Sequence, residues 1–170
     1  MKKLILARHA KTEPLSDAGT DFERKLKKRG ITDAGLVAVD LKRRGYIPEL
    51  IISSPARRAM QTAKIYAANF GIPEEDIVVA GIIYDGDTTE RMIAAIAELA
   101  RDTSTLMVVG HNPDMARLSM LLSSQEFYHY PTSAVTVISF PVMTWQEVEV
   151  GRGKADYFTY PRMLKDLGTL

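Results

Sequence analysis

Four short apolar runs rich in Ile, Val and Leu are spread along this 170-residue chain, and they constrain its fold more than any other feature. The runs cover residues 4–7, 50–52, 106–109 and 135–140. Runs of this length and composition are typical of buried strands. Between them, apolar side chains recur at i, i+3, i+4 and i+7 over residues 34–41 and 92–99, which predicts amphipathic helices.

Strands that alternate with helices indicate βαβ units. We therefore expect an α/β fold with a mainly parallel sheet and helices on both faces. Gly45 and Gly71 are placed to cap the C-terminal ends of two helices. The last part of the chain, residues 135–140 and 145–150 with Pro141–Thr144 between them, predicts a closing hairpin at the sheet edge.

Composition narrows the class of protein. With 46% hydrophobic residues and no repeat or linker, the sequence predicts one domain over residues 1–170. The formal net charge of +1 gives no basic footprint for nucleic acid, and no apolar stretch is long enough to span a membrane. The chain contains no cysteine, and we expect a cytoplasmic protein without a disulfide framework.

Polar residues come directly after three of the predicted strands. They are Arg8-His9, then Ser53 to Arg58, then Gly110 to Pro113. Open α/β sheets bind ligands at the C-terminal ends of their strands, so these segments are expected to meet. Ser54-Pro55 and Asn112-Pro113 each predict an N-cap followed by proline at the first helical position.

Helix N-termini attract anions, and guanidinium groups match the oxygens of phosphate. Each piece alone is weak, because a histidine after a strand, such as His111, is more often structural. Taken together, Arg8, His9, Arg58 and His111 at the ends of three separate strands favour a phosphate site.

The same segments resemble the histidine phosphatase superfamily. Leu6 to Lys11 is similar to its nucleophile motif, with Ala10 where many members have glycine, as in SixA-type phosphohistidine phosphatases. Ser54 to Thr62 is similar to the motif Ser-Pro-x-x-Arg-Ala-x-Gln-Thr, which assigns the phosphate-binding role to Arg58 and not to Arg57. Val109 to Pro113 is similar to the motif of the second histidine, His111.

The resemblance extends to Asp21–Leu26 and Arg29-Gly30, which are similar to a SixA-type Asp-x-x-Arg-Pro-Leu and Arg-Gly signature with Lys25 in place of proline. It leaves two roles open for Arg24, a further phosphate ligand or a loop salt bridge. It implies a three-layer sandwich of the phosphoglycerate mutase type.

The resemblance also implies a metal-independent phosphatase without a cofactor. Neutral His9 attacks phosphorus, and Arg8, Arg58 and protonated His111 hold the phosphoryl oxygens. Water then hydrolyses the phosphohistidine enzyme intermediate.

Many esterases of this superfamily also use a carboxylic acid to protonate the leaving group. Here the candidates are Asp85, which is equally suited to a turn with Gly86, and Asp87, which is equally suited to capping a helix. A phosphorus–nitrogen bond needs such an acid less, and the short stretch between Gly71 and Thr105 leaves little room for a lid. Both points favour protein phosphohistidine as the substrate.

Two alternatives stay open at this point. One is a small-molecule phosphomonoesterase with the same site, or less plausibly a phosphoglycerate-type mutase. The other is a non-catalytic module that binds phosphorylated partners.

Overall fold

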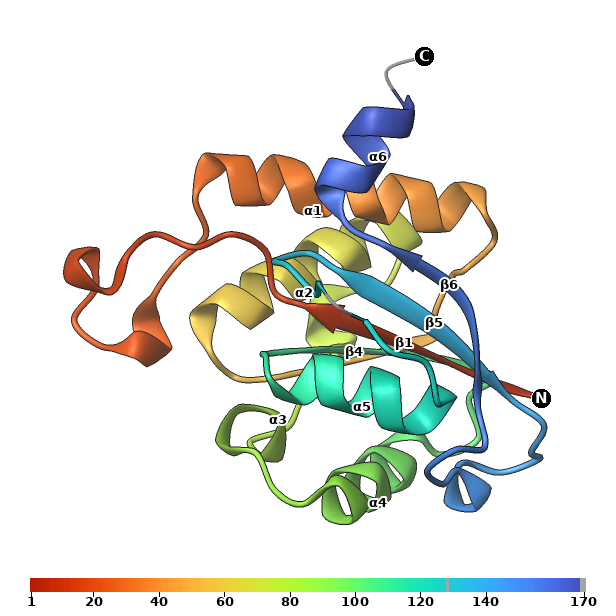
Figure 1. The fold of residues 1–170 in the computed structure, drawn as a ribbon. Coiled ribbons are helices and arrows are strands. Elements are labelled where there is room, and N and C mark those ends of the chain that lie inside the picture. Colours follow the sequence, from red (N-terminus) through yellow and green to blue (C-terminus); the bar gives the residue numbers. More distant parts are fainter. Residues whose placement is uncertain (128, 169–170) are drawn as a thin grey trace.

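A six-stranded sheet lies at the centre of the computed structural model, which describes residues 1–127 and 129–168. The strand order is β3-β2-β4-β1-β5-β6. Figure 1 labels four of these strands, β4, β1, β5 and β6, which lie side by side. The strands are β1 (Lys2–Arg8), β2 (Leu50–Ser53), β3 (Val78–Val79), β4 (Thr105–Gly110), β5 (Val135–Phe140) and β6 (Lys154–Thr159).

The sheet is mainly parallel, as predicted. The pairs β1–β4, β2–β4 and β2–β3 are parallel, and β5 runs antiparallel to both of its neighbours, β1 and β6. In this register Arg8 lies opposite Gly110, and Ser53 lies opposite Val109. The ends of β1, β2 and β4 therefore meet at one edge of the sheet.

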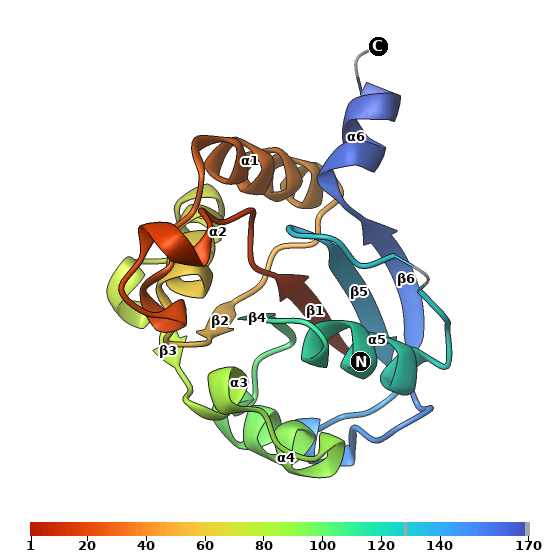
Figure 2. The ribbon, with the colours of Figure 1, turned by 60° about the vertical axis from the view of Figure 1, so that its left-hand side comes forward.

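Helices cover both faces of the sheet (Figure 2). They are α1 (Lys28–Arg43), α2 (Arg57–Phe70), α3 (Ile82–Asp85), α4 (Thr89–Ala100), α5 (Asp114–Ser123) and α6 (Pro161–Gly168). Short 3₁₀ helices lie at Leu15–Asp17, Asp21–Glu23, Glu74–Asp76 and Trp145–Glu147. Among the described residues, no helix is both long enough and apolar enough to cross a bilayer.

Alternate side chains of each strand enter different cores, because successive strand residues point to opposite faces. Leu4 and Leu6 of β1 belong to the core beneath α4 and α5. Ile5 and Ala7 belong to the core beneath α1 and α2. This arrangement is the three-layer α/β sandwich that the sequence predicted.

The closing hairpin differs from the prediction. The strand that pairs with β5 is β6, and residues 145–150 contain a 3₁₀ helix instead of a strand. Trp145 is buried and its Nε1–H donates to the carbonyl of Thr103, while Glu147 accepts hydrogen bonds from the backbone N–H and hydroxyl of Thr144. This local capping turn outweighs the strand-like alternation of the segment.

The helix starts also differ from the prediction, whereas the glycine caps are confirmed. Helix α2 begins at Arg57 and α5 at Asp114, so neither Ser54 nor Asn112 is an N-cap. Their side chains contact His111 and the carbonyl of Tyr130 instead. Gly45 and Gly71 follow α1 and α2 with φ of 81° and 72°, the left-handed conformation that glycine adopts without strain.

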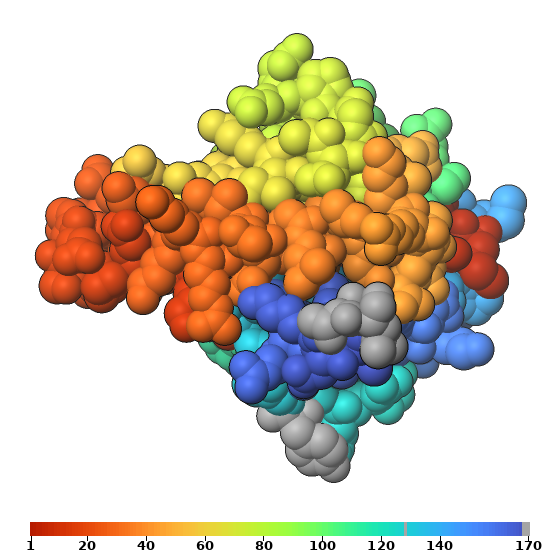
Figure 3. Space-filling model, turned by 90° about the horizontal axis from the view of Figure 1, so that it is seen from above, coloured from red at the N-terminus to blue at the C-terminus, as the bar shows by residue number. Residues whose placement is uncertain are grey.

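Residues 11–27 form a lobe that projects beyond the layers (Figure 3). An isolated bridge joins Thr12 to Leu26 at its base, and the N–H of Glu13 donates to the carbonyl of Lys25. The lobe leaves the sheet directly after β1 and returns to the start of α1, so it stands beside the strand ends.

Candidate active site

A pocket of about 590 Å³ opens at the edge where β1, β2 and β4 end. Backbone hydrogen bonds bring the strand ends together there, because the N–H of His9 donates to Gly110 and the N–H of Ser54 donates to Val109. The pocket is lined by Arg8, His9, Lys11, Thr12, Arg24, Arg58, His111, Asn112, His129, Pro131 and Thr132. The structure thus gathers the four principal site residues that the sequence singled out.

His9 is held in a defined protonation state. Its Nδ1 lies 2.8 Å from the backbone oxygen of Ala10, which can only accept a hydrogen bond. Nδ1 therefore carries the proton, and Nε2 keeps its lone pair. The ring is buried, and its centroid is 5.3 Å from that of His111.

Burial lowers the pKa of His9 to about 3. The hydrogen bond to Ala10 partly opposes this effect. Electrostatic repulsion from His111, Arg58 and Arg8 lowers the pKa of His9 further. His9 is therefore neutral at physiological pH, as a nitrogen nucleophile must be.

His111 is held by Ser54. Its Nε2 lies 2.7 Å from Ser54 Oγ, which also accepts the N–H of Ala56. A hydroxyl can donate to an unprotonated Nε2 or accept from a protonated one. When it donates, His111 carries its own proton on Nδ1, a buried atom without a partner among the described residues. A neutral His111 can donate this proton to an anion.

The protein groups that surround His111, taken by themselves, favour its neutral form over the protonated form that was expected. Burial lowers its pKa to about 4, and the charges of Arg58 and Arg8 lower the pKa as well, against the opposing effect of Asp21. Two neighbouring guanidinium groups make a third positive charge unfavourable. The positive charge of the site therefore comes from arginine, and His111 contributes a neutral donor.

Arg8 and Arg58 are each oriented by hydrogen bonds to neighbouring groups of the protein. Nη1 of Arg8 donates to the carbonyl of Tyr130, and the two terminal nitrogens of Arg58 donate to Asp21. The Nε atom of each guanidinium is buried and has no partner in the described part of the chain. Buried donors of this kind are costly unless an anion accepts from them.

Comparison with known proteins places the chain among phosphatases. The family model described as the histidine phosphatase superfamily (branch 1) matches residues 4–77, a range that includes Arg8, His9 and Arg58. An uncharacterized chloroplastic protein of Arabidopsis thaliana is 31% identical over 153 residues, which are 86% of this chain and 70% of that protein. The chain belongs to the histidine phosphatase superfamily.

Solved structures of the superfamily share the fold. A protein of Agrobacterium tumefaciens assigned as the phosphohistidine phosphatase SixA has a TM-score of 0.78 and 28% identity, over 94% of this chain and 98% of that one. A mycobacterial glucosyl-3-phosphoglycerate phosphatase has a TM-score of 0.68 and 19% identity, over 92% and 97% of the two chains, and this likeness concerns the fold alone. This histidine phosphatase is thus of the SixA type.

Asp21 is a site residue that our sequence reasoning missed. Its carboxylate accepts from Arg58, from Arg24 and from the hydroxyl of Tyr84. Burial raises its pKa, but these hydrogen bonds and the charge of Arg58 outweigh that effect, and the net pKa is lowered. The Asp-x-x-Arg signature contained the signal, since it places Asp21 one turn before Arg24.

Arg24 makes the loop salt bridge that was one of the two roles left open for it, and its role as a phosphate ligand stays a prediction. It lines the pocket, and its guanidinium also donates to Asp21 Oδ1, Thr12 Oγ1 and the carbonyl of Glu13. Tyr84, which the sequence did not single out, packs edge-on against His111 with ring centroids 5.5 Å apart. These contacts join the lobe and α3 to the pocket.

Asp85 and Asp87 do not line the pocket, and both are exposed. Asp85 ends α3 beside Gly86, whose φ of 77° makes the expected turn. Asp87 is not the helix cap, because Thr88 Oγ1 accepts the N–H of Arg91 at the start of α4. In the described residues, the pocket wall of this superfamily member contains no carboxylate.

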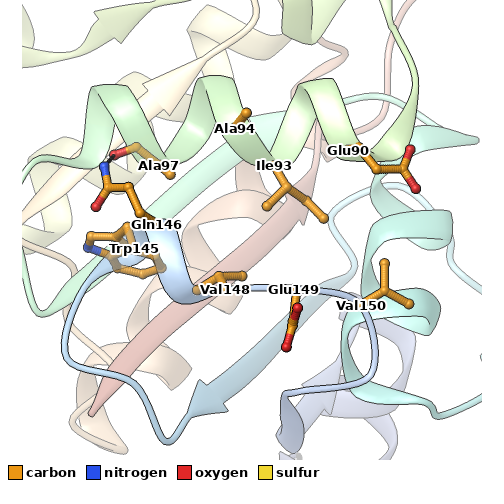
Figure 4. A pocket seen from close by; sticks show the side chains of 9 residues that line it. All are labelled: Glu90, Ile93, Ala94, Ala97, Trp145, Gln146, Val148, Glu149 and Val150. Carbon is orange, nitrogen blue, oxygen red and sulfur yellow. Dashed lines mark hydrogen bonds between the residues drawn. The ribbon is translucent and has the colours of Figure 1, made fainter.

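A second pocket, of about 280 Å³, lies between α4 and residues 145–150 (Figure 4). Ile93 and Trp145 contribute apolar surface, and Glu90 and Glu149 contribute carboxylates. It shares no residue with the histidine pocket. Negative charge and apolar walls make it unsuitable for phosphate.

Proposed function

We propose that the protein is a phosphatase in which Nε2 of His9 attacks phosphorus and becomes phosphorylated. Arg8, Arg58 and Nδ1–H of His111 hold the phosphoryl oxygens. The observation that supports this most directly is the His9–Ala10 hydrogen bond, because it leaves Nε2 unprotonated in a pocket where those three residues have buried, unpaired nitrogen atoms.

The reaction has two steps. In the first, the Nε2 lone pair forms a bond to phosphorus while the bond to the leaving atom breaks and its electron pair departs with the leaving group. In the second, water attacks phosphorus, the Nε2–phosphorus bond breaks, and inorganic phosphate leaves with neutral His9 restored. Phosphoryl transfer requires mainly positioning and charge stabilisation, which the arginines provide.

We propose protein phosphohistidine as the substrate. The support is the pocket wall, which in the described residues has three arginines and no carboxylic acid to protonate an alkoxide. An imidazole that is protonated on its other nitrogen leaves as a neutral molecule and needs no such acid.

We also propose that the reaction needs no metal. The described residues contain no cluster of three or more His, Cys, Asp or Glu side chains suited to a metal ion. The arginines supply the charge that a metal supplies in other phosphoryl-transfer enzymes. Activity should therefore be unchanged by a chelator, measured with and without added Mg²⁺.

A small-molecule phosphomonoesterase is the second candidate. The pocket is large enough for a small phosphate ester, and a small-molecule phosphatase shares the fold. A mutase and a non-catalytic phosphate-binding module are less well supported. A protein that only binds phosphate would have no use for the unprotonated Nε2 of His9.

The test is a comparison of turnover on four substrates. They are a phosphohistidine protein, a phosphoserine peptide, a sugar phosphate and p-nitrophenyl phosphate. We expect the highest kcat/KM for phosphohistidine and none with His9→Ala. A clear preference for a sugar phosphate would contradict the assignment of phosphohistidine as the substrate. Binding of phosphate without turnover would favour a non-catalytic phosphate-binding module.

A further inference from the structure

Lys11 lies in the wall of the histidine pocket with its charge unpaired. Its side chain is only partly exposed, and within the described residues its ammonium group makes no hydrogen bond or ion pair. By contrast, Lys25 on the same lobe pairs with Glu13. An unpaired cation in a pocket that the protein uses for phosphate is a candidate for binding substrate.

The backbone of Lys11 is fixed in place. Its carbonyl accepts the N–H of Lys27 at 2.9 Å, and Gly30 of α1 packs directly against it. A Cβ at position 30 would lie 2.2 Å from the carbonyl oxygen of Lys11, so only glycine allows this approach. The start of α1 therefore fixes the backbone from which the Lys11 side chain extends.

The pocket carries more positive charge than one phosphoryl group can neutralise. Its permanent cations are Arg8, Lys11, Arg24 and Arg58, while burial keeps its two principal histidines neutral. One carboxylate, Asp21, contacts two of the arginines. Four positive charges and one negative charge leave an excess of three, and a phosphoryl dianion supplies two negative charges.

The pocket also has room beyond the phosphoryl group. Its volume of about 590 Å³ suits a ligand of several functional groups, and Thr12, His129 and Thr132 complete its walls. With Lys11 and Arg24 contributed by the lobe, the pocket wall beyond Arg8 and Arg58 consists of basic and neutral groups.

We infer that the substrate carries a second anionic group beside the phosphoryl group, and that Lys11 binds it. The inference rests on the proposed function, because it assumes that phosphorus is attacked by His9. The second anion is a carboxylate, either an acidic side chain next to the phosphohistidine of a protein or the carboxylate of a small phosphate ester.

Matched substrate pairs test this. One pair is a phosphohistidine peptide with flanking Glu residues and the same peptide with Gln. The other is carboxyphenyl phosphate and carbamoylphenyl phosphate. In the wild type we expect kcat/KM to favour the charged member by about fivefold, the effect of one partly screened ion pair, and to do so less at high salt.

Three variants identify the residue responsible. Lys11→Met should abolish the preference, and Lys11→Arg should retain it. Lys28→Met is the control, because Lys28 is an exposed lysine at the start of α1 that does not line the pocket and its loss changes the net charge equally. That variant should keep the full preference.

Binding to the His9→Ala protein, measured by calorimetry, separates this inference from the proposed reaction. A charge preference in Kd that Lys11→Met removes supports the role of Lys11 even if turnover fails. A preference in the peptide pair or in the ester pair supports the inference and identifies the source of the carboxylate. Equal affinities within both pairs, or a preference that survives Lys11→Met, would overturn it.

Discussion

Nδ1 of His9 lies 2.8 Å from the backbone oxygen of Ala10, and this contact determines which nitrogen of the ring is free to react. The second histidine contacts the hydroxyl of Ser54, at 2.7 Å from its Nε2. In the mechanism proposed above, this hydroxyl donates to Nε2, so that Nδ1 carries the proton in both rings. His9 then acts as the nucleophile and His111 as a neutral donor.

The hydroxyl of Ser54 should matter for catalysis. If Ser54 donates to Nε2 of His111 as proposed, Ser54→Ala removes that donor and allows the ring proton to move from Nδ1 to Nε2, away from the phosphoryl group. We expect kcat/KM to fall about fivefold, the effect of one hydrogen bond. Steady-state kinetics measure this, and Ser54→Thr, which keeps the hydroxyl, should recover most of the loss. Equal activity of Ser54→Ala and wild type would contradict the assignment.

Stability should decline as the pH falls below the ordinary histidine range. The pKa of His9 is about 3 and that of His111 about 4 in the folded state, whereas an unfolded histidine has a pKa near 6.5. Below pH 6.5 the unfolded chain therefore binds more protons, and stability is lost progressively down to about pH 4 for His111 and about pH 3 for His9. Each buried neutral histidine contributes a slope of up to about 1.4 kcal/mol per pH unit.

Urea unfolding between pH 7.5 and pH 5 measures this slope. His9→Asn removes one titrating group, so its free energy of unfolding should depend less steeply on pH. An identical slope in the variant would show that His9 is not the buried neutral group described above.

Asp21 should act as a positioning residue. Asp21→Asn keeps the shape of the side chain but weakens its hold on Arg58 and Arg24, so both guanidinium groups gain freedom. We expect kcat/KM to fall roughly tenfold and the affinity for vanadate, an anion of similar shape to the transferred group, to weaken in parallel. If vanadate binding stays unchanged while the folded protein loses stability, the role of Asp21 is structural only.

Gly30 should be far less tolerant of a side chain than Gly35 on the same helix. A Cβ at position 30 meets the backbone of Lys11, whereas a Cβ at position 35 meets nothing within 4 Å. We expect Gly30→Ala to lower the free energy of unfolding by about 1–3 kcal/mol. Gly35→Ala should raise it by about 0.5–1 kcal/mol, because alanine favours the helix. Thermal or urea unfolding of the two variants checks both signs, and a stable Gly30→Ala protein would refute the close packing.

The sequence predicted the layers and the meeting of the strand ends because those depend on local patterns. The apolar runs at 4–7 and 106–109 lie within β1 and β4, and parallel pairing then places Arg8-His9 beside His111. The Ser-Pro-x-x-Arg spacing also identified Arg58, which is buried in the pocket, over Arg57, which is exposed.

What the sequence did not predict depends on contacts between distant segments. Serine is a common N-cap residue, but the hydroxyl of Ser54 contacts His111, which is 57 residues away in the sequence. Asp21 binds Arg58, which is 37 residues away in the sequence, and a local motif cannot predict such a pair. The neutral state of His111 likewise follows from burial, which no single strand end reveals.

Trapping the enzyme with a ³²P-labelled substrate tests the central claim most directly. After a rapid quench, the label should be acid-labile and base-stable, as a phosphoramidate is, and peptide mapping should locate it on His9. The His9→Ala protein should carry no label and show no turnover. A label on another residue, or turnover that survives His9→Ala, would contradict the mechanism.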